Sequence, residues 1–83
     1  MQLFRQNKMF GYKYYRFSLA LSKDDLLSIY QGVIKKVRVR TDKGLVLELD
    51  ANHLKKFTTQ DGIYGNFELA TTQDNKFVEI KKI

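Results

Sequence analysis

The stretch VIKKVRVRTDKGLVLELDA, residues 33–51, decides the fold because it predicts two strands joined by a tight turn. Apolar and polar residues alternate on both sides of TDKG, residues 41–44, as they do in half-buried strands. A three-residue loop that ends in a left-handed glycine, here Gly44, is a common hairpin connection. The stretch therefore predicts a β-hairpin.

The loop also sets the register of this hairpin. With three residues in the loop, apolar residues face apolar residues and basic residues face acidic residues at every step. The predicted pairs are Val39–Leu47, Val37–Leu49, Arg38–Glu48 and Lys36–Asp50. A shift of one residue would move every side chain to the other face, so the pattern favours this register alone.

Two helical segments are indicated on either side of the hairpin. SKDDLLSIYQG, residues 22–32, begins with Ser22 as N-cap and Asp25 as its capping-box partner, and it ends with Gly32 as a left-handed cap. DANHLKKF, residues 50–57, predicts a single helical turn. Asp50 or Asn52 caps this turn, and Leu54 and Phe57 enter the core.

Three further strands are predicted. Residues 13–21, KYYRFSLAL, alternate between apolar and polar side chains. A second hairpin joins residues 62–72 to 76–83, with Asp74 and Asn75 at its tip. Its predicted pairs are Thr72–Phe77, Leu69–Ile80, Glu68–Lys81 and, as a poorer match, Phe67–Lys82.

These elements predict an α+β protein. Their order is strand, helix, strand, strand, short helical turn, strand, strand, and the short connections favour a small, mostly antiparallel five-stranded sheet. The pattern leaves open whether this sheet is open or partly closed into a barrel. In a chain of 83 residues, we expect residues 1–12 to be a loosely ordered lead and residues 13–83 a single compact domain.

The composition argues against several kinds of function. There is no cysteine and only one histidine, His53, so we expect no disulfide, no metal site and no cofactor. No nucleophile-elbow or phosphate-loop motif is present, and we expect neither catalytic residues nor an enzyme. We also expect no membrane span and a cytoplasmic location.

The net charge of +6 is concentrated in residues 1–16 and 34–57. Solubility is one explanation, and a polyanion such as nucleic acid is the other. Because Arg38 and Lys36 face acidic residues in the hairpin, the uncompensated candidates form a basic rim. The candidate polyanion-binding residues are Arg40, Lys43, Lys55, Lys56 and Arg16.

Two other partner classes stay open. An exposed sheet edge, or the lead of residues 1–12, could bind another protein. A small barrel could hold a ligand, although the RxxxR signature of cyclic-dinucleotide-binding domains is missing.

The segments YRFSL, YQG, VRVRTDKG and NKFVEIKKI resemble a family of short bacterial proteins described as domain of unknown function 2835. The resemblance covers about residues 14–83. Its most specific part is residues 54–67, with Phe57, Thr58, Gly62, Ile63, Gly65 and Phe67. It implies a single compact cytoplasmic domain and supplies no activity and no catalytic residues.

Overall fold

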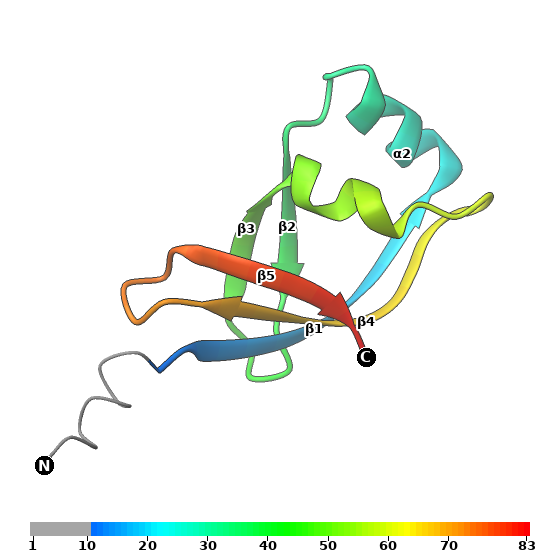
Figure 1. The fold of residues 1–83 in the computed structure, drawn as a ribbon. Helices are drawn as coiled ribbons and strands as arrows, with labels where there is room; N and C mark the ends of the chain where they lie inside the picture. Colours follow the sequence, from blue (N-terminus) through cyan, green and yellow to red (C-terminus); the bar gives the residue numbers. More distant parts are fainter. Residues whose placement is uncertain (1–10) are drawn as a thin grey trace, which may run out of the picture.

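The structure is a computed structural model that describes residues 11–83 (Figure 1). Its elements are β1 (Lys13–Ser22), α2 (Lys23–Tyr30), β2 (Lys36–Arg40), β3 (Val46–Asp50), the 3₁₀ helix η1 (Ala51–Phe57), β4 (Gly62–Thr71) and β5 (Phe77–Lys82). They form a small α+β fold with five strands in two antiparallel sheets. The predicted lead, residues 1–12, falls almost entirely outside the described residues.

The β2–β3 hairpin has the predicted register at all four pairs. The amide of Thr41 donates to the carbonyl of Leu45 at 2.7 Å, and Gly44 has a φ of 86°. A side chain at Gly44 would be strained in this left-handed conformation, so the glycine sets the loop and the loop sets the register.

The other sheet has the order β1-β4-β5. β1 and β4 pair over ten residues, from Lys13 opposite Thr71 to Ser22 opposite Gly62. At Gly62 the φ is 128°, and a Cβ atom would lie 2.1 Å from the carbonyl oxygen of Leu21. Only glycine lets β4 begin this close to the end of β1.

Most of the predicted β4–β5 register is confirmed, at Leu69–Ile80, Glu68–Lys81 and Phe67–Lys82. The Thr72–Phe77 pair is wrong, because Thr71 faces Phe77. The loop holds one residue more than predicted, since Thr72 bonds to Lys76 and Asn75 takes a φ of 66°. A register shift after Ala70 absorbs the extra residue.

The prediction of one five-stranded sheet, open or closed into a barrel, is wrong. β4 lies beside β1 in one sheet and β2 pairs with β3 in the other, and Phe17 of β1 forms an isolated bridge with Thr41, the residue after β2. The amides of Val33 and Ile34 both donate to the carbonyl of Ser28. These bonds hold the start of β2 close to α2. Because the strands of residues 11–83 form two separate sheets, they do not close into a barrel.

Both helical segments begin as predicted. Ser22 and Asp25 exchange side-chain and backbone hydrogen bonds of 3.1 and 3.2 Å in a capping box, and Gly32 has a φ of 78°. The carboxylate of Asp50 caps η1 by accepting from the amide of Asn52 at 2.9 Å. Neither helix of the described part is long and apolar enough to span a membrane.

The core lies between the two sheets, α2 and η1 (Figure 1). Its most completely buried large side chains are Phe67, Leu54, Ile63 and Ile80. The ring of Phe67 packs edge-on against Phe57, with centroids 4.8 Å apart. Leu54 is fully buried and Phe57 packs against the core, so both side chains of η1 enter the core as predicted.

Candidate functional site

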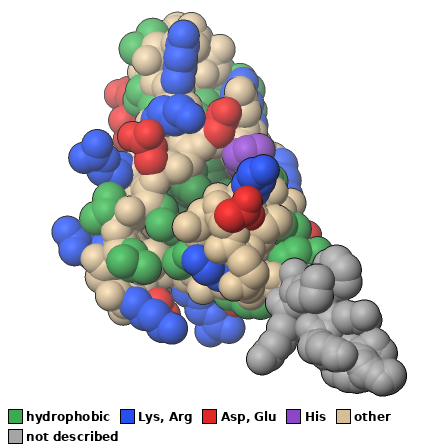
Figure 2. All heavy atoms as spheres, turned by 90° about the vertical axis from the view of Figure 1, so that its left-hand side faces the viewer, with side chains coloured by type: hydrophobic (Ala, Val, Ile, Leu, Met, Phe, Trp, Pro, Cys, Tyr) green, Lys and Arg blue, Asp and Glu red, His purple; other side chains and the backbone are tan. Residues whose placement is uncertain are grey.

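The structure separates the predicted basic rim into two groups. Arg40 and Lys43 lie at the turn end of the β2–β3 hairpin, whereas Lys55 and Lys56 lie on η1, beyond its opposite end. Five strand residues place these ends about 13 Å apart. Figure 2 shows Lys and Arg side chains spread over one face with Asp and Glu side chains between them. Polyanion binding by this set of residues stays a prediction.

Arg16, the fifth candidate, is ion-paired. Its Nε lies 3.1 Å from Oε2 of Glu68, and the other oxygen of Glu68 lies 3.7 Å from Nζ of Lys81. The Glu68 side chain is only 13% exposed, so one largely covered carboxylate contacts two cations on the outward face of the sheet. The positive charge of Arg16 is therefore partly compensated, by a carboxylate that it shares with Lys81.

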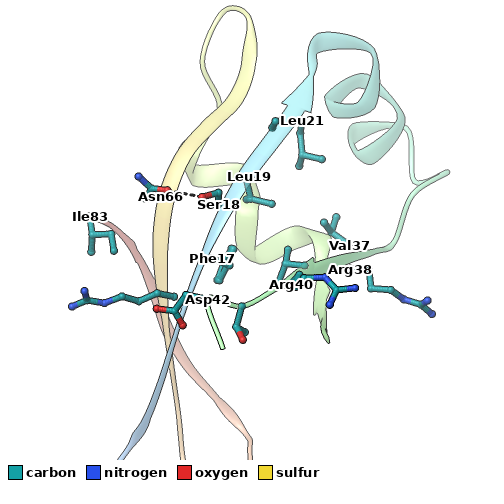
Figure 3. Close-up of a pocket in the computed structure, with 14 residues that line it drawn as sticks. Phe17, Ser18, Leu19, Leu21, Val37, Arg38, Arg40, Asp42, Asn66 and Ile83 are labelled. Carbon is teal, nitrogen blue, oxygen red and sulfur yellow. Dashed lines mark hydrogen bonds between the residues drawn. The ribbon is translucent and has the colours of Figure 1, made fainter. Parts of the chain in front are cut away.

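A groove of about 710 Å³ lies between β1 and β2. Its narrow end is the Phe17–Thr41 bridge, where the amide of Asp42 also donates to the carbonyl of Arg16 at 2.9 Å. Side chains of Leu19, Leu21, Val37 and Val39 line its floor, and Figure 3 shows this space from close by. We call this space the β1–β2 groove.

One wall of the groove is the outer edge of β2. Successive residues of a strand direct their backbone groups to opposite edges. Thr41 and Lys35 bond on the β3 side, to Leu45 and Ala51. The backbone groups of Lys36, Arg38 and Arg40 therefore point away from β3, toward β1.

The opposite wall is the outer edge of β1. The carbonyl of Arg16 points toward β2, because it accepts from Asp42, and the same alternation directs Ser18 and Ala20 to this edge. Beyond the Phe17–Thr41 bridge, the described residues form no further β1–β2 pairing. Two unpaired strand edges thus face each other across the groove.

Three arginines line the groove: Arg16, Arg38 and Arg40. Arg38 is 3.9 Å from Glu48, and both side chains are more than half exposed, so this pair contributes little. Within residues 11–83, no carboxylate lies within ion-pair distance of Arg40, which faces Val46. The sequence pattern identified both Arg16 and Arg40 as candidates, but it did not predict that they line the same groove from opposite strands.

A second basic hollow, of about 370 Å³, lies between α2 and η1. Lys35, Lys36 and Lys55 line it together with Tyr30, and Nζ of Lys55 is 5.1 Å from the centre of the Tyr30 ring. Lys36 and Asp50 are cross-strand neighbours but form no ion pair, contrary to the predicted compensation. The sequence carried one signal for this group, the adjacent Lys35 and Lys36.

His53 stacks on Phe77, with ring centres 3.7 Å apart and planes 7° from parallel. It borders a third hollow, of about 540 Å³, on the free side of β3, and the purple side chain in Figure 2 marks its place. Among residues 11–83, no three His, Cys, Asp or Glu side chains gather into a metal-binding group. Stacking on Phe77 gives His53 a packing role.

The comparison with protein families gives one match, to the family described as "Protein of unknown function (DUF2835)", over residues 13–83. The chain belongs to this family. No curated protein and no solved structure matched it. The DUF2835 match begins at Lys13, the first residue of β1, one residue before the start of the resemblance seen in the sequence. It includes both walls of the β1–β2 groove.

Proposed function

We propose that this DUF2835 chain is a non-catalytic binding module that captures an extended segment of a partner protein in the β1–β2 groove. The observation that carries the proposal is the pair of unpaired strand edges, Ala20 on β1 and Arg38 on β2, on opposite walls of one groove. A partner strand can hydrogen-bond to such an edge and extend the sheet.

The edge of β2 is the better template for an added strand. Lys36, Arg38 and Arg40 direct their backbone groups to this side, and those of Lys36 and Arg38 lie beyond the Phe17–Thr41 bridge, where β1 and β2 are unpaired. On β1, the edge is shorter because the amide of Ser22 is already used by Asp25 in the capping box. We therefore assign the partner segment to β2, with β1 as the opposite wall.

The chemistry of the groove supports binding without a reaction. The hydroxyl of Ser18 donates to Oδ1 of Asn66 at 2.6 Å, and no histidine lines the space. Ser18 thus has no base that could activate it as a nucleophile. The other polar side chains that line the groove are those of Arg16, Arg38, Arg40, Thr41 and Asp42, and none of them is hydrogen-bonded to the hydroxyl of Ser18.

The test begins with a random peptide library selected on the whole protein. The best peptide is then remade with N-methyl groups at every second residue, in two versions. Strand addition predicts that one version loses binding and the other keeps it, because only alternate amides face β2. Recovery of no peptide, or equal binding of both versions, would contradict the proposal.

A matched pair of variants locates the peptide. Arg38→Pro and Arg38→Gln lose the same charge, but only the proline removes the amide that faces the groove. We expect Arg38→Gln to keep binding of the selected peptide and Arg38→Pro to lose it, with both proteins folded by circular dichroism. Equal binding by both variants would move the peptide to another surface.

Single-stranded nucleic acid is the second candidate, favoured by the hollow where Lys35, Lys36 and Lys55 lie beside the half-exposed ring of Tyr30. A base can stack on such a ring while lysines contact the phosphates. Three contacts predict a slope of about −2 for the logarithm of affinity against that of salt concentration. Fluorescence anisotropy with labelled oligothymidylate and oligouridylate tests this, and no binding at low salt would exclude it.

A further inference from the structure

The outward face of β2 carries a row of three cations. Lys36, Arg38 and Arg40 are all exposed, whereas Val37 and Val39 between them are buried. On one side of this row lies β3, whose outward residues Asp50, Glu48 and Val46 face the cations. On the other side the edge is free, and the facing residues of β1, Ser18 and Ala20, carry no charge.

β3 shows which sequence pattern fits beside β2. In VLELD, residues 46–50, leucines face inward opposite Val37 and Val39, and the two acids face outward opposite Arg38 and Lys36. A strand added to the free edge of β2 meets the same alternation of valine and cation. We infer that the captured partner segment is acidic, with Asp or Glu alternating with small apolar residues. This inference rests on the proposed function.

The cations are available to such a segment. Directly paired residues have Cβ atoms about 5 Å apart on one face of a sheet, and long side chains also reach the diagonal neighbours. A carboxylate opposite Arg38 therefore lies within reach of the guanidinium of Arg40. The exposed Arg38–Glu48 contact of 3.9 Å competes only weakly, and Arg40 has no acidic partner within residues 11–83.

The inward positions set the size of the apolar residues. Leu19, Val37 and Val39 on the groove floor are each at most 9% exposed, so little apolar surface remains to be covered. Short β-branched side chains fit this space and favour the extended conformation. Valine and threonine are therefore preferred at the inward positions of the segment.

The experiment compares three labelled synthetic octapeptides by fluorescence anisotropy with the whole protein. In them Glu, Gln or Lys alternates with Val. Two cross-strand charge pairs predict that the Glu peptide binds about fivefold more tightly than the Gln peptide at low salt. The Lys peptide should bind most weakly. Equal affinities for all three would overturn the inference.

Two double variants with the same loss of charge locate the effect. Arg38→Gln with Arg40→Gln should remove the preference for Glu over Gln, while binding of the Gln peptide stays within about twofold. Lys55→Gln with Lys56→Gln should keep the preference, because η1 lies beyond the other end of the hairpin. Loss of the preference in the second variant alone would overturn the assignment to β2.

The outcomes separate this inference from the proposed function. If the Gln and Glu peptides bind equally and remain sensitive to N-methylation at alternate residues, strand addition stands and the acidic preference fails. If no peptide binds, both fail. Binding of oligothymidylate that depends on Arg38 and Arg40, without binding of any peptide, would replace the protein partner by nucleic acid.

Discussion

The amide nitrogen of Asp42 lies 2.9 Å from the carbonyl oxygen of Arg16, and this hydrogen bond closes one end of the β1–β2 groove. The hairpin turn is thereby fixed to the edge of the three-stranded sheet at one point. Toward the start of β2, β1 and β2 share no further pairing, and the segment before β2 is hydrogen-bonded to α2 instead. The groove is thus a consequence of how the two sheets are connected.

The free edge of β1 predicts unusual tolerance of proline at Ala20. The amide of Ala20 points into the groove, so Ala20→Pro should lower the free energy of unfolding by no more than about 1 kcal/mol, as proline does at edge positions. Leu19→Pro, which breaks a bond to β4 and disturbs the core, should cost about 3 kcal/mol or more. Urea unfolding measures both. A similar loss for the two variants would mean that the Ala20 amide is bonded.

Substitution of Gly62 by alanine should lower the free energy of unfolding strongly, although it adds only one methyl group. A Cβ atom there would lie 2.1 Å from the carbonyl oxygen of Leu21, and the φ of 128° is unfavourable for alanine. We expect Gly62→Ala to cost about 3 kcal/mol or more, since strain and overlap add. Gly44→Ala, where φ is 86° but the space is open, should cost about 1–2 kcal/mol. Equal losses would contradict the close approach of β1 and β4.

Leu54 tests the contribution of η1 to the core. Its side chain is fully buried, so Leu54→Ala should lower the free energy of unfolding by about 2–5 kcal/mol. Leu27 of α2 is 55% exposed, so Leu27→Ala should change the free energy of unfolding by about 0.5 kcal/mol at most. Denaturant titration followed by circular dichroism compares them, and a small effect at Leu54 would show that η1 is not packed on the sheets.

Glu68 joins Arg16 and Lys81 across all three strands of the larger sheet. Because Glu68 is largely covered and both cations are exposed, Glu68→Gln should lower the free energy of unfolding by about 1 kcal/mol. The loss should be smaller in high salt, which screens the ion pairs. Glu48→Gln, which loses only an exposed pair, is the matched control and should have almost no effect. Thermal unfolding at two salt concentrations distinguishes them.

Local patterns were sufficient to predict the hairpins but not the assembly of the sheets. Gly44 and the alternation around it determine every β2–β3 pair. The second hairpin differs from its prediction only near the turn, where Asn75 takes a left-handed conformation and lengthens the loop. The pairing of β1 with β4 joins residues about fifty positions apart, and nothing in the pattern of β1 distinguishes β4 from β2 as its neighbour.

The candidate site was predicted less completely for the same reason. Arg40 was identified because the predicted register gave acidic partners to Lys36 and Arg38 only, and its partner in the structure is the uncharged Val46. The ion pair of Arg16 with Glu68, and the position of Lys55 beside Lys35 and Lys36, depend on contacts between distant parts of the chain. The groove between two strand edges depends on the separation of the sheets, which no local pattern indicates.

Amide hydrogen exchange at Arg38, followed by NMR, tests the central claim most directly. In the free protein the amides of Val37 and Val39 should exchange slowly, because they bond to β3, whereas that of Arg38 should exchange fast. Saturation with the Glu–Val octapeptide should slow exchange at Arg38 as an added strand forms. An Arg38 amide that is already protected in the free protein, or that stays unprotected with bound peptide, would contradict strand addition in the β1–β2 groove.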